Sequence, residues 1–251
     1  MKIIIPMAGS SKRFSIAGYE LPKFFLKIGK TSVIENVLNT YNDNDDFYLI
    51  FSESQRKKYK KEILNLKKFK KKINISFIKD HNKGPVYSII SANFKFYDSK
   101  IIIAYNDFII NWDYKKFLRI IEGYDASIVS FKNFHPSSFT GTLYCYLKSK
   151  NGLIKNLREK KSFTKNPSKE PASVGIYYFE SFDLFLNEAC KLIKKKKILI
   201  NNELYVSQIY LNLIKEKRNI LDYNVENFIS LGTPRDYELF IYWKDYFQNA
   251  R

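Results

Sequence analysis

The first half of the chain alternates short, almost continuous apolar runs with stretches of helical periodicity. The apolar runs are KIIIP (2–6), FYLIF (47–51), INISFI (73–78) and IIIAY (101–105). Apolar residues recur at three- and four-residue spacing over 32–42, 54–72 and 85–96. Strands that alternate with helices predict crossover connections and a parallel sheet. Because the runs lack a polar alternation, we expect helices to cover both faces of that sheet.

The second half has a different rhythm, because its strand-like segments follow one another closely. Strands are predicted at 125–132, 142–148, 152–157, 173–179 and 219–224. Helices are predicted at 114–122, 181–197, 203–216 and 234–247. We therefore expect an α/β fold, with a three-layer α/β/α arrangement around a mixed, mostly parallel sheet. No repeat or Pro/Gly/Ser-rich linker divides the sequence, so one domain is expected over 1–251.

The strongly basic composition allows two interpretations. The 251 residues carry a formal net charge of +18, which suits a nucleic-acid-binding protein or a protein that meets an anionic surface. Arginine, however, occurs only seven times among the 43 basic residues, whereas phosphate recognition usually favours the arginine fork. The densest run, RKKYKKEILNLKKFKKK (56–72), has the spacing of an amphipathic helix with a lysine-rich solvent face. Solvated lysine faces are the simpler interpretation.

Compartment follows from what the sequence lacks. No run approaches the ~20 apolar residues that span a bilayer, and no signal-peptide pattern precedes the first apolar run. Cys145 and Cys190 stand in no metal-like spacing. We expect a cytoplasmic protein without membrane insertion.

The segment IIIPMAGSSKRF (3–14) runs from a strand directly into small residues and cations. Small residues let backbone N–H groups converge on an anion, and Lys12 and Arg13 add positive charge. Lys23 follows Pro22 ten residues after Arg13 and could meet the same phosphate group. The segment matches neither the P-loop nor the dinucleotide fingerprint, and an ordinary turn beside a solvent lysine explains it equally.

An ordered set of segments resembles the sugar nucleotidyltransferases, also called nucleoside-diphospho-sugar pyrophosphorylases. The set begins with the AG-x-x-x-R loop and Pro22-Lys23, and it continues along almost the whole chain. The later segments are DHNKGPVYSIISA (80–92), NDFIINWD (106–113), FHP (134–136), LREKKSF (157–163), ASVGIYYF (172–179), NNELYVSQIYLNLI (201–214) and FISLGTPRDYELF (228–240). The likeness is greatest to a subgroup of bacterial capsule and surface-glycan nucleotidyltransferases and small cytidylyltransferases.

The resemblance implies a Rossmann-like fold and a defined reaction. A phosphorylated acceptor attacks the α-phosphorus of a nucleoside triphosphate, and pyrophosphate leaves. The nucleotide-binding half would be about 1–112 and the acceptor-binding half about 113–251. CTP is the favoured nucleotide, with UTP, dTTP and GTP as alternatives. Sugar phosphates or phosphorylated alcohols and amino compounds, such as phosphocholine and phosphoglutamine, are the expected acceptors.

The resemblance also implies residue roles. Catalytic roles fall to Arg13, Lys23, Asp107 and Lys160, and Asp107 would bind Mg²⁺. The implied nucleotide-binding residues are Ala8, Gly9, Ser10, Ser11, Lys12 and Gly84. The implied acceptor-binding residues are Glu159, Lys160, Gly175 and His135. Each has a plainer alternative: a turn cap for Asp107, an exposed charged pair for Glu159-Lys160, and loop packing for His135.

The sequence departs from the family pattern at three positions. Ser11 stands where many relatives have a second glycine, and Lys12 where many have Thr or Ser. Ser230 stands where many have a second metal-binding aspartate, so Glu203 or Asp113 could complete the site, or one carboxylate suffices. Asp113 is better explained as the N-cap of the helix that follows it.

Two other functions compete with nucleotidyl transfer. A glycosyltransferase of the same nucleotide-binding fold would consume a nucleotide sugar and would not need the cationic loop. A basic nucleic-acid-binding protein would explain the charge alone. The expected partners are a nucleoside triphosphate and a phosphorylated acceptor, without nucleic acid, and a homodimer is possible.

Overall fold

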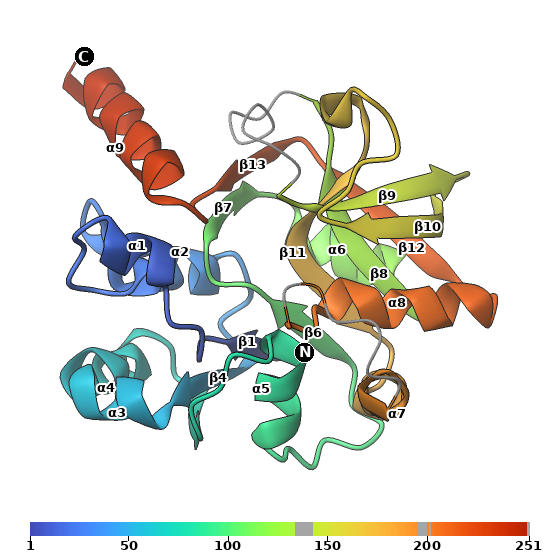
Figure 1. Cartoon of the computed structure of the whole chain (residues 1–251), viewed down its shortest axis with the longest axis horizontal. Coiled ribbons are helices and arrows are strands. Elements are labelled where there is room, and N and C mark those ends of the chain that lie inside the picture. The colour runs from blue at the N-terminus through green and yellow to red at the C-terminus, as the bar shows by residue number, and fades with distance from the viewer. Residues whose placement is uncertain (134–142, 195–199, 201, 250–251) are drawn as a thin grey trace.

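A nine-stranded mixed sheet forms the centre of the protein in a computed structural model that describes residues 1–133, 143–194, 200 and 202–249 (Figure 1). Its strands are β1 (Lys2–Pro6), β4 (Asp46–Ser52), β5 (Ile73–Ile78), β6 (Ile101–Ala104), β8 (Ala126–Phe131), β9 (Cys145–Lys150), β10 (Leu153–Glu159), β11 (Ala172–Phe179) and β12 (Ile220–Val225). Their order across the sheet is β5-β4-β1-β6-β11-β8-β12-β10-β9. Both halves of the chain contribute strands to this sheet.

Strand direction confirms the mixed, mostly parallel sheet that the sequence predicts. β5, β4, β1 and β6 pair in parallel, and Ile4 of β1 lies opposite Tyr48 and Ile103. β11 runs antiparallel to both β6 and β8, and β10 runs antiparallel to β12 and β9. The parallel pairs are joined by helices, whereas β9 and β10 are joined by a tight turn, which permits only antiparallel pairing.

The sheet is covered on both faces because its strands are apolar on both faces. In β1, Ile3 and Ile5 pack into one buried cluster and Ile4 into another, as the period of two along a strand requires. The first cluster takes apolar residues from α2 (Val33–Asn39), α4 (Lys60–Phe69) and α6 (Tyr114–Ile120). The second takes them from α5 (Pro85–Ser91), α7 (Phe182–Lys194) and α8 (Val206–Lys215). Three layers result.

Two predicted helices are shorter in the structure. The helix expected over 54–72 is divided at Tyr59 into α3 (Glu53–Lys58) and α4, because Tyr59 leaves helical geometry at φ −122°. Its ring packs on the core, and its hydroxyl donates a hydrogen bond to the Glu20 carbonyl at 3.1 Å. The helix expected over 85–96 ends at Ser91, and Asn93 then adopts a left-handed φ of 52°.

A small ribbon outside the main sheet was not predicted. β7 (Phe108–Asn111) pairs antiparallel with β13 (Asn227–Ser230), and Phe108 lies opposite Ser230. A second short pair joins β2 (Lys27–Ile28) to β3 (Thr31–Ser32), after α1 (Lys12–Ile16). The β7–β13 ribbon brings the segment after β6 against the turn that precedes α9 (Pro234–Asn249).

None of the described helices is long and apolar enough to cross a membrane. The longest of them, α9, has 16 residues.

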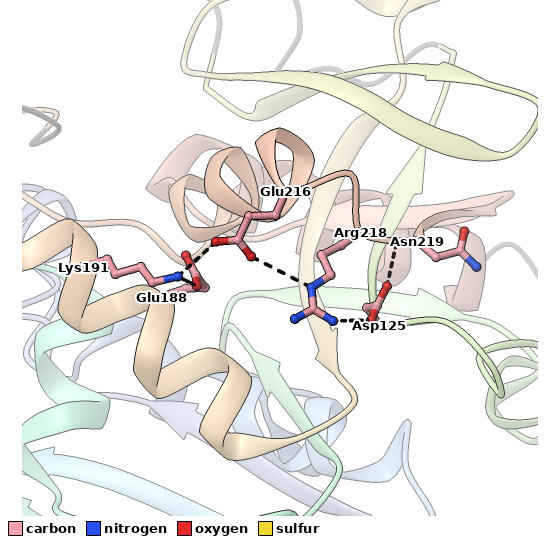
Figure 2. Close-up of polar contacts among 6 residues, drawn as sticks. All are labelled: Asp125, Glu188, Lys191, Glu216, Arg218 and Asn219. Atoms are coloured by element: carbon pink, nitrogen blue, oxygen red, sulfur yellow. Dashed lines mark hydrogen bonds and ion pairs between the residues drawn. The ribbon is translucent and has the colours of Figure 1, made fainter.

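A chain of polar contacts joins α7, the end of α8 and the start of two strands (Figure 2). Glu188 of α7 is buried and accepts a hydrogen bond from Lys191, which also pairs with Glu216 after α8. Arg218 then contacts Glu216 and donates to Asp125 at 3.0 Å, just before β8. A buried carboxylate is stable only when paired, so Lys191 compensates the charge of Glu188. These contacts fix the positions of α7 and α8 relative to each other and to the sheet.

Candidate active site

The predicted site residues come together in one cavity of about 540 Å³. Every one of them that the structure describes lines this cavity: Ala8, Gly9, Ser10, Ser11, Lys12, Arg13, Lys23, Gly84, Asp107, Glu159, Lys160 and Gly175. His135 lies outside the described residues. The segments after β1, β5 and β6 supply about half of the lining residues, at the carboxyl ends of parallel strands, where open α/β sheets bind ligands.

The loop after β1 is shaped to receive an anion. Ser11 adopts a left-handed conformation (φ 50°, ψ 34°) directly before α1, which turns the chain sharply. Among the described residues, the N–H groups of Gly9, Ser10 and Ser11 have no hydrogen-bond acceptor, and Gly9 and Ser10 are exposed. Successive unpaired N–H groups in such a turn make an anion-binding concavity. Lys12 and Arg13 follow at once and add positive charge.

Gln55, which the sequence did not reveal as a site residue, holds this loop in place. Its Nε2 donates hydrogen bonds to the carbonyls of Met7 at 2.9 Å and Gly9 at 3.0 Å. Its Oε1 accepts from the Ser52 N–H at 2.9 Å in a capping box at the start of α3. The Gln55 side chain thus draws the loop carbonyls towards the protein and leaves the N–H groups facing the cavity. Only its place three residues after a capping serine hinted at a special role.

Lys23 and Asp107 form an ion pair inside the cavity. The Lys23 Nζ lies 2.6 Å from Asp107 Oδ2, and both side chains are about one quarter exposed. The backbone also holds Asp107, whose carbonyl accepts a hydrogen bond from the Leu231 N–H at 2.7 Å. The two residues are 84 positions apart in the sequence. Asp107 follows the buried strand β6, and Lys23 begins a short helical turn.

Ser230 lies beside Asp107, where the family resemblance places a second metal-binding aspartate. A Cβ built on Gly232 would lie 3.2 Å from Asp107 Oδ2 and 3.3 Å from Ser230 Oγ. Gly232 therefore leaves open the space between these two oxygens. Mg²⁺ is usually held by one or two carboxylates together with substrate phosphates, rather than by a full protein cage. One carboxylate, one hydroxyl and an open space fit that donor set.

Asp113 and Glu203, the two alternatives for a second carboxylate, differ in whether they line the cavity. Asp113 caps α6, accepting a hydrogen bond from the Lys116 N–H at 2.8 Å, and it does not line the cavity. Glu203 does line the cavity, but its carboxylate accepts a hydrogen bond from the Tyr205 hydroxyl. Asp113 is thus a helix cap, as expected.

Gly84 is required by a close approach of two chain segments. It has a φ of +89°, and a Cβ there would lie 2.7 Å from the Leu204 nitrogen and 2.8 Å from the Leu204 oxygen. The Leu204 N–H donates to the Lys83 carbonyl at 2.9 Å. The glycine thus joins the segment after β5 to the one before α8, which brings Glu203 and Tyr205 into the cavity.

A second cavity of about 590 Å³ adjoins the first near the loop after β1. The two share Ala8, Ser10, Ser11, His81 and Asn82. His81 Nδ1 accepts from the Lys83 N–H at 3.1 Å, which leaves the ring proton on Nε2, 3.2 Å from Ser88 Oγ. Burial lowers the pKa of His81. The neutral ring forms part of a polar wall.

Glu159 and Lys160 face the cavity from the end of β10. Glu159 accepts a hydrogen bond from the Ser207 hydroxyl at 2.5 Å, and burial raises the pKa of its carboxyl. Lys160 adopts a left-handed φ of 54°, which is uncommon for lysine and turns the chain at the end of the strand. Its Nζ lies 2.5 Å from the Tyr205 hydroxyl and 4.3 Å from the centre of that ring.

Tyr205 and Glu203 extend this acidic and aromatic side of the cavity. The Tyr205 hydroxyl lies between Lys160 and Glu203, and burial together with the hydrogen bond to Glu203 raises its pKa. The sequence singled out Glu203 only as a possible second metal ligand, and Tyr205 stood only within a longer family segment. Gly175 lies opposite with a φ of +90°, and a Cβ there would meet the Tyr105 ring at 2.9 Å.

The cavity therefore carries cationic groups from several segments that suit phosphate. Lys12 and Arg13 come from the segment after β1, Lys23 from the turn after Pro22 and Lys160 from the end of β10, and Asp107 also lines the space. A phosphate is already a competent nucleophile, so such a site needs to orient the groups and neutralise their charge, without an activated serine or cysteine. Fold and site together define a class of protein: an α/β enzyme that transfers phosphorus-containing groups.

Comparison with known proteins names the family. A family model described as "Nucleotidyl transferase" matches residues 2–246, so the chain belongs to the nucleotidyl transferase family and is a nucleotidyltransferase. No curated protein matched the chain.

Solved structures share the fold at low sequence identity. A nucleoside-diphosphate-sugar pyrophosphorylase from Vibrio cholerae RC9 is 19 % identical, with a TM-score of 0.78 over 95 % of this chain and 99 % of that one. A UDP-glucose pyrophosphorylase with bound UDP-glucose is 17 % identical, with a TM-score of 0.74 over 100 % and 99 %. The inositol-1-phosphate CTP transferase from T. maritima is 13 % identical, with a TM-score of 0.66 over 94 % and 90 %.

Proposed function

We propose that this nucleotidyltransferase is Mg²⁺-dependent and joins a nucleoside triphosphate to a phosphorylated small molecule, with release of pyrophosphate. The observation that carries the proposal is the gathering of four cationic side chains and the Asp107 carboxylate around a single cavity. Lys23 and Arg13 lie on the side of the β1 loop, Lys160 on the side of β10, and Asp107 also lines the space.

The residues divide the work of the transfer. The loop N–H groups, Arg13 and Lys23 bind the triphosphate and stabilise the charge that builds up on the leaving pyrophosphate. Lys160 orients the acceptor phosphate. An oxygen of that phosphate attacks the α-phosphorus, and the bond from the α-phosphorus to the oxygen that bridges the α- and β-phosphates breaks. That oxygen and the electron pair leave with the pyrophosphate, so no proton acceptor is needed.

Asp107 and Ser230 would hold the metal ion. When bound, Mg²⁺ neutralises phosphate oxygens and fixes their geometry. In the absence of phosphate, Asp107 is instead neutralised by Lys23 at 2.6 Å.

The second cavity is a suitable size and polarity for the nucleoside. It opens beside the loop that would hold the triphosphate and is lined by Ser10, Ser52, Ser54 and Asn82 among others. We favour CTP, because Ser230 in place of a second carboxylate separates this chain from many sugar-1-phosphate enzymes. The similar T. maritima protein bears the name of a CTP transferase.

The acceptor side favours a molecule with a phosphate at one end and an amino or quaternary ammonium group at the other. Beside Lys160 the cavity wall carries two carboxylates, Glu159 and Glu203, and the wall also has aromatic rings that include Tyr144, Tyr177, Tyr205 and Phe228. Aromatic faces and carboxylates attract ammonium groups, as for phosphocholine or an amino-acid phosphate. Sugar phosphates remain an alternative, since the same carboxylates accept hydrogen bonds from hydroxyls.

The proposal extends to the role of the enzyme in the cell. The resemblance to capsule and surface-glycan enzymes suggests that the product feeds surface-polysaccharide synthesis in the cytoplasm. We further propose one domain over 1–251, with nucleotide binding in 1–112 and acceptor binding in 113–251. The close approach of Glu203 and Leu204 to Gly84 supports a site to which both segments contribute.

One panel experiment tests the proposal. Pyrophosphate release is measured for CTP, UTP, dTTP and GTP against sugar phosphates, phosphocholine and phosphorylated amino acids, with Mg²⁺ and with EDTA. We expect release only from a matched pair, only with the metal, and fastest with CTP. Lys23→Ala and Asp107→Asn should each lower turnover at least about 100-fold. Lys68→Ala, on the exposed face of α4, is the control and should change little.

Three outcomes would overturn the proposal. They are absence of release from every pair, release that does not depend on Mg²⁺, and normal turnover in both variants. Consumption of a nucleotide sugar without pyrophosphate chemistry would favour a glycosyltransferase. Tight, steeply salt-dependent binding to arbitrary duplex without any transfer would favour a nucleic-acid-binding protein.

A further inference from the structure

Helix α9 packs on the protein with only one of its faces. Tyr237, Phe240 and Ile241 contact a small buried cluster that contains Phe14 and Leu26. The Tyr237 hydroxyl donates a hydrogen bond to the Lys27 carbonyl at 2.7 Å. Figure 1 shows the helix extending away from the sheet beyond α1 and α2, so that its C-terminal end lies far from the core.

A second apolar stripe runs along the opposite side of α9. Its members are Leu239, Tyr242, Trp243, Tyr246 and Phe247, which are between 37 % and 63 % exposed. Their spacing of three and four residues is that of a buried helix face. Of the large apolar side chains described as exposed, half belong to this stripe.

The aromatic rings of the stripe form a preordered surface. Trp243 stacks on Phe247 with ring centres 5.9 Å apart, and it meets Tyr242 and Tyr246 edge to face. Rings that already support one another lose little conformational freedom when a partner covers them. A contiguous exposed patch of this kind marks an interaction site.

Charge indicates what covers the stripe. The chain as a whole carries a net charge of +18, so most surfaces of two copies repel each other. α9 is an exception, because two basic and three acidic side chains give it a net charge of −1. Lys244 is paired with Asp245 at 3.1 Å, and the other basic side chain of the helix, Arg235, lies in the first turn, eight residues before Trp243, so the stripe is not surrounded by basic side chains that would attract nucleic acid or an anionic membrane. Two copies can therefore approach most easily through this helix.

The area is also sufficient for a pair. An aromatic side chain buries about 150–250 Å², so five side chains that are about half exposed offer roughly 500 Å² per copy. A symmetric contact would bury about 1,000 Å² in total, which is the lower limit for a specific interface. A two-fold axis lets the same stripe serve both copies.

We propose that the stripe of α9 is a homodimer contact, in which the α9 helices of two copies pack against each other about a two-fold axis. The contact is separate from the catalytic residues, although Thr233 and Asp236 of the first turn of α9 line the cavity. Its test does not depend on transfer activity.

The molar mass of the full chain is measured by light scattering and sedimentation from 1 to 100 μM. We expect a dimer in the wild type at the higher concentrations, and at least a tenfold weaker association for Trp243→Glu and Phe247→Glu. Leu64→Glu and Tyr97→Glu place the same charge at other exposed apolar positions and should leave the dimer unchanged. Circular dichroism and thermal melting confirm that each variant is folded.

A cross-link tests the geometry of the same contact. In a Cys190→Ser background, Trp243→Cys should form an intermolecular disulfide, whereas Tyr97→Cys should not. A wild type that stays monomeric at 100 μM would overturn the proposal, as would a dimer that Trp243→Glu leaves intact. Binding of the monomeric wild type to lipid vesicles through the same residues would also contradict it.

Discussion

Lys23 and Asp107 face each other across 2.6 Å in a cavity that also faces Lys12, Arg13 and Lys160. Each neutralises the other before any substrate binds. In the proposed reaction, a triphosphate would compete with Asp107 for Lys23, and a metal ion would compete with Lys23 for Asp107. Binding of the two would therefore be coupled, and by linkage each would increase the affinity of the enzyme for the other.

Lys23→Met should have opposite effects on the affinity for the metal ion and on the affinity for the triphosphate. Without its counter-ion, Asp107 should bind Mg²⁺ or Mn²⁺ about three- to tenfold more tightly in the free enzyme, while affinity for the triphosphate falls. Titration calorimetry with the metal alone measures the first effect. Lys27→Met is the control, since Lys27 pairs with Glu35 at the surface instead. Unchanged metal affinity in Lys23→Met would show that the pair does not control metal binding.

Glu159 is a partly buried carboxyl whose desolvation should affect the free energy of unfolding. Burial raises its pKa above the usual 4.5, so the folded protein holds the proton more tightly than the unfolded chain does. The stabilising effect is complete below pH 4.5 and is lost as the pH rises through the raised pKa.

Glu159→Gln removes this titration and keeps an oxygen that accepts from Ser207. In urea unfolding at pH 4 to 8, the wild type should lose stability relative to the variant as the pH rises. Turnover in the variant should fall about tenfold or more. Glu170→Gln is the contrasting control, because the Glu170 carboxylate accepts from Phe163 and Thr164 and should be needed for stability. Parallel pH profiles for wild type and Glu159→Gln would contradict the assignment.

At the scale of elements, α3 positions the loop after β1. Its capping residue Gln55 connects the start of the helix to the Met7 and Gly9 carbonyls. Two strands that are adjacent in the sheet, β1 and β4, are thereby joined again beyond their ends.

Gln55→Leu should loosen the loop without unfolding the protein. It leaves two loop carbonyls without their donor, which costs about 1–3 kcal/mol. We expect KM for the triphosphate to rise about tenfold with a smaller change in kcat, measured by steady-state pyrophosphate release. Asn74→Leu removes an exposed amide from the outer strand β5 and should leave KM unchanged. An unaltered KM in Gln55→Leu would show that the loop keeps its shape unaided.

The limits of sequence-based prediction are clearest for elements. The strands from 2–6 to 101–105 were predicted almost to their ends, because uninterrupted apolar runs have few alternatives. β7 and β13 were not predicted, because each is short and pairs only across more than a hundred residues. Tyr59 was placed inside a helix because its spacing fits, whereas its contact with Glu20 ends that helix.

At the scale of the molecule, we expect turnover to be independent of the net charge of +18. We expect that Lys67→Glu combined with Lys68→Glu, which lowers the net charge to +14, changes kcat/KM less than about twofold at 150 mM salt. Charges exposed on α4 are screened within about 8 Å at this ionic strength. Retention on duplex DNA at low salt should fall. A loss of turnover above tenfold would mean that the basic face contributes to substrate capture.

The sequence by itself determined the alternation of strands and helices, the cationic loop at a strand end and the family motifs. These properties depend on neighbouring residues, whose backbone preferences and spacing are local. Only the tertiary structure decided that Lys23 pairs with Asp107, that Gln55 holds the loop, and that Ser230 lies beside the Asp107 carboxylate. It also decided that α9 keeps an aromatic face uncovered. Such contacts depend on which strands become neighbours, and the total free energy of the folded chain selects that arrangement.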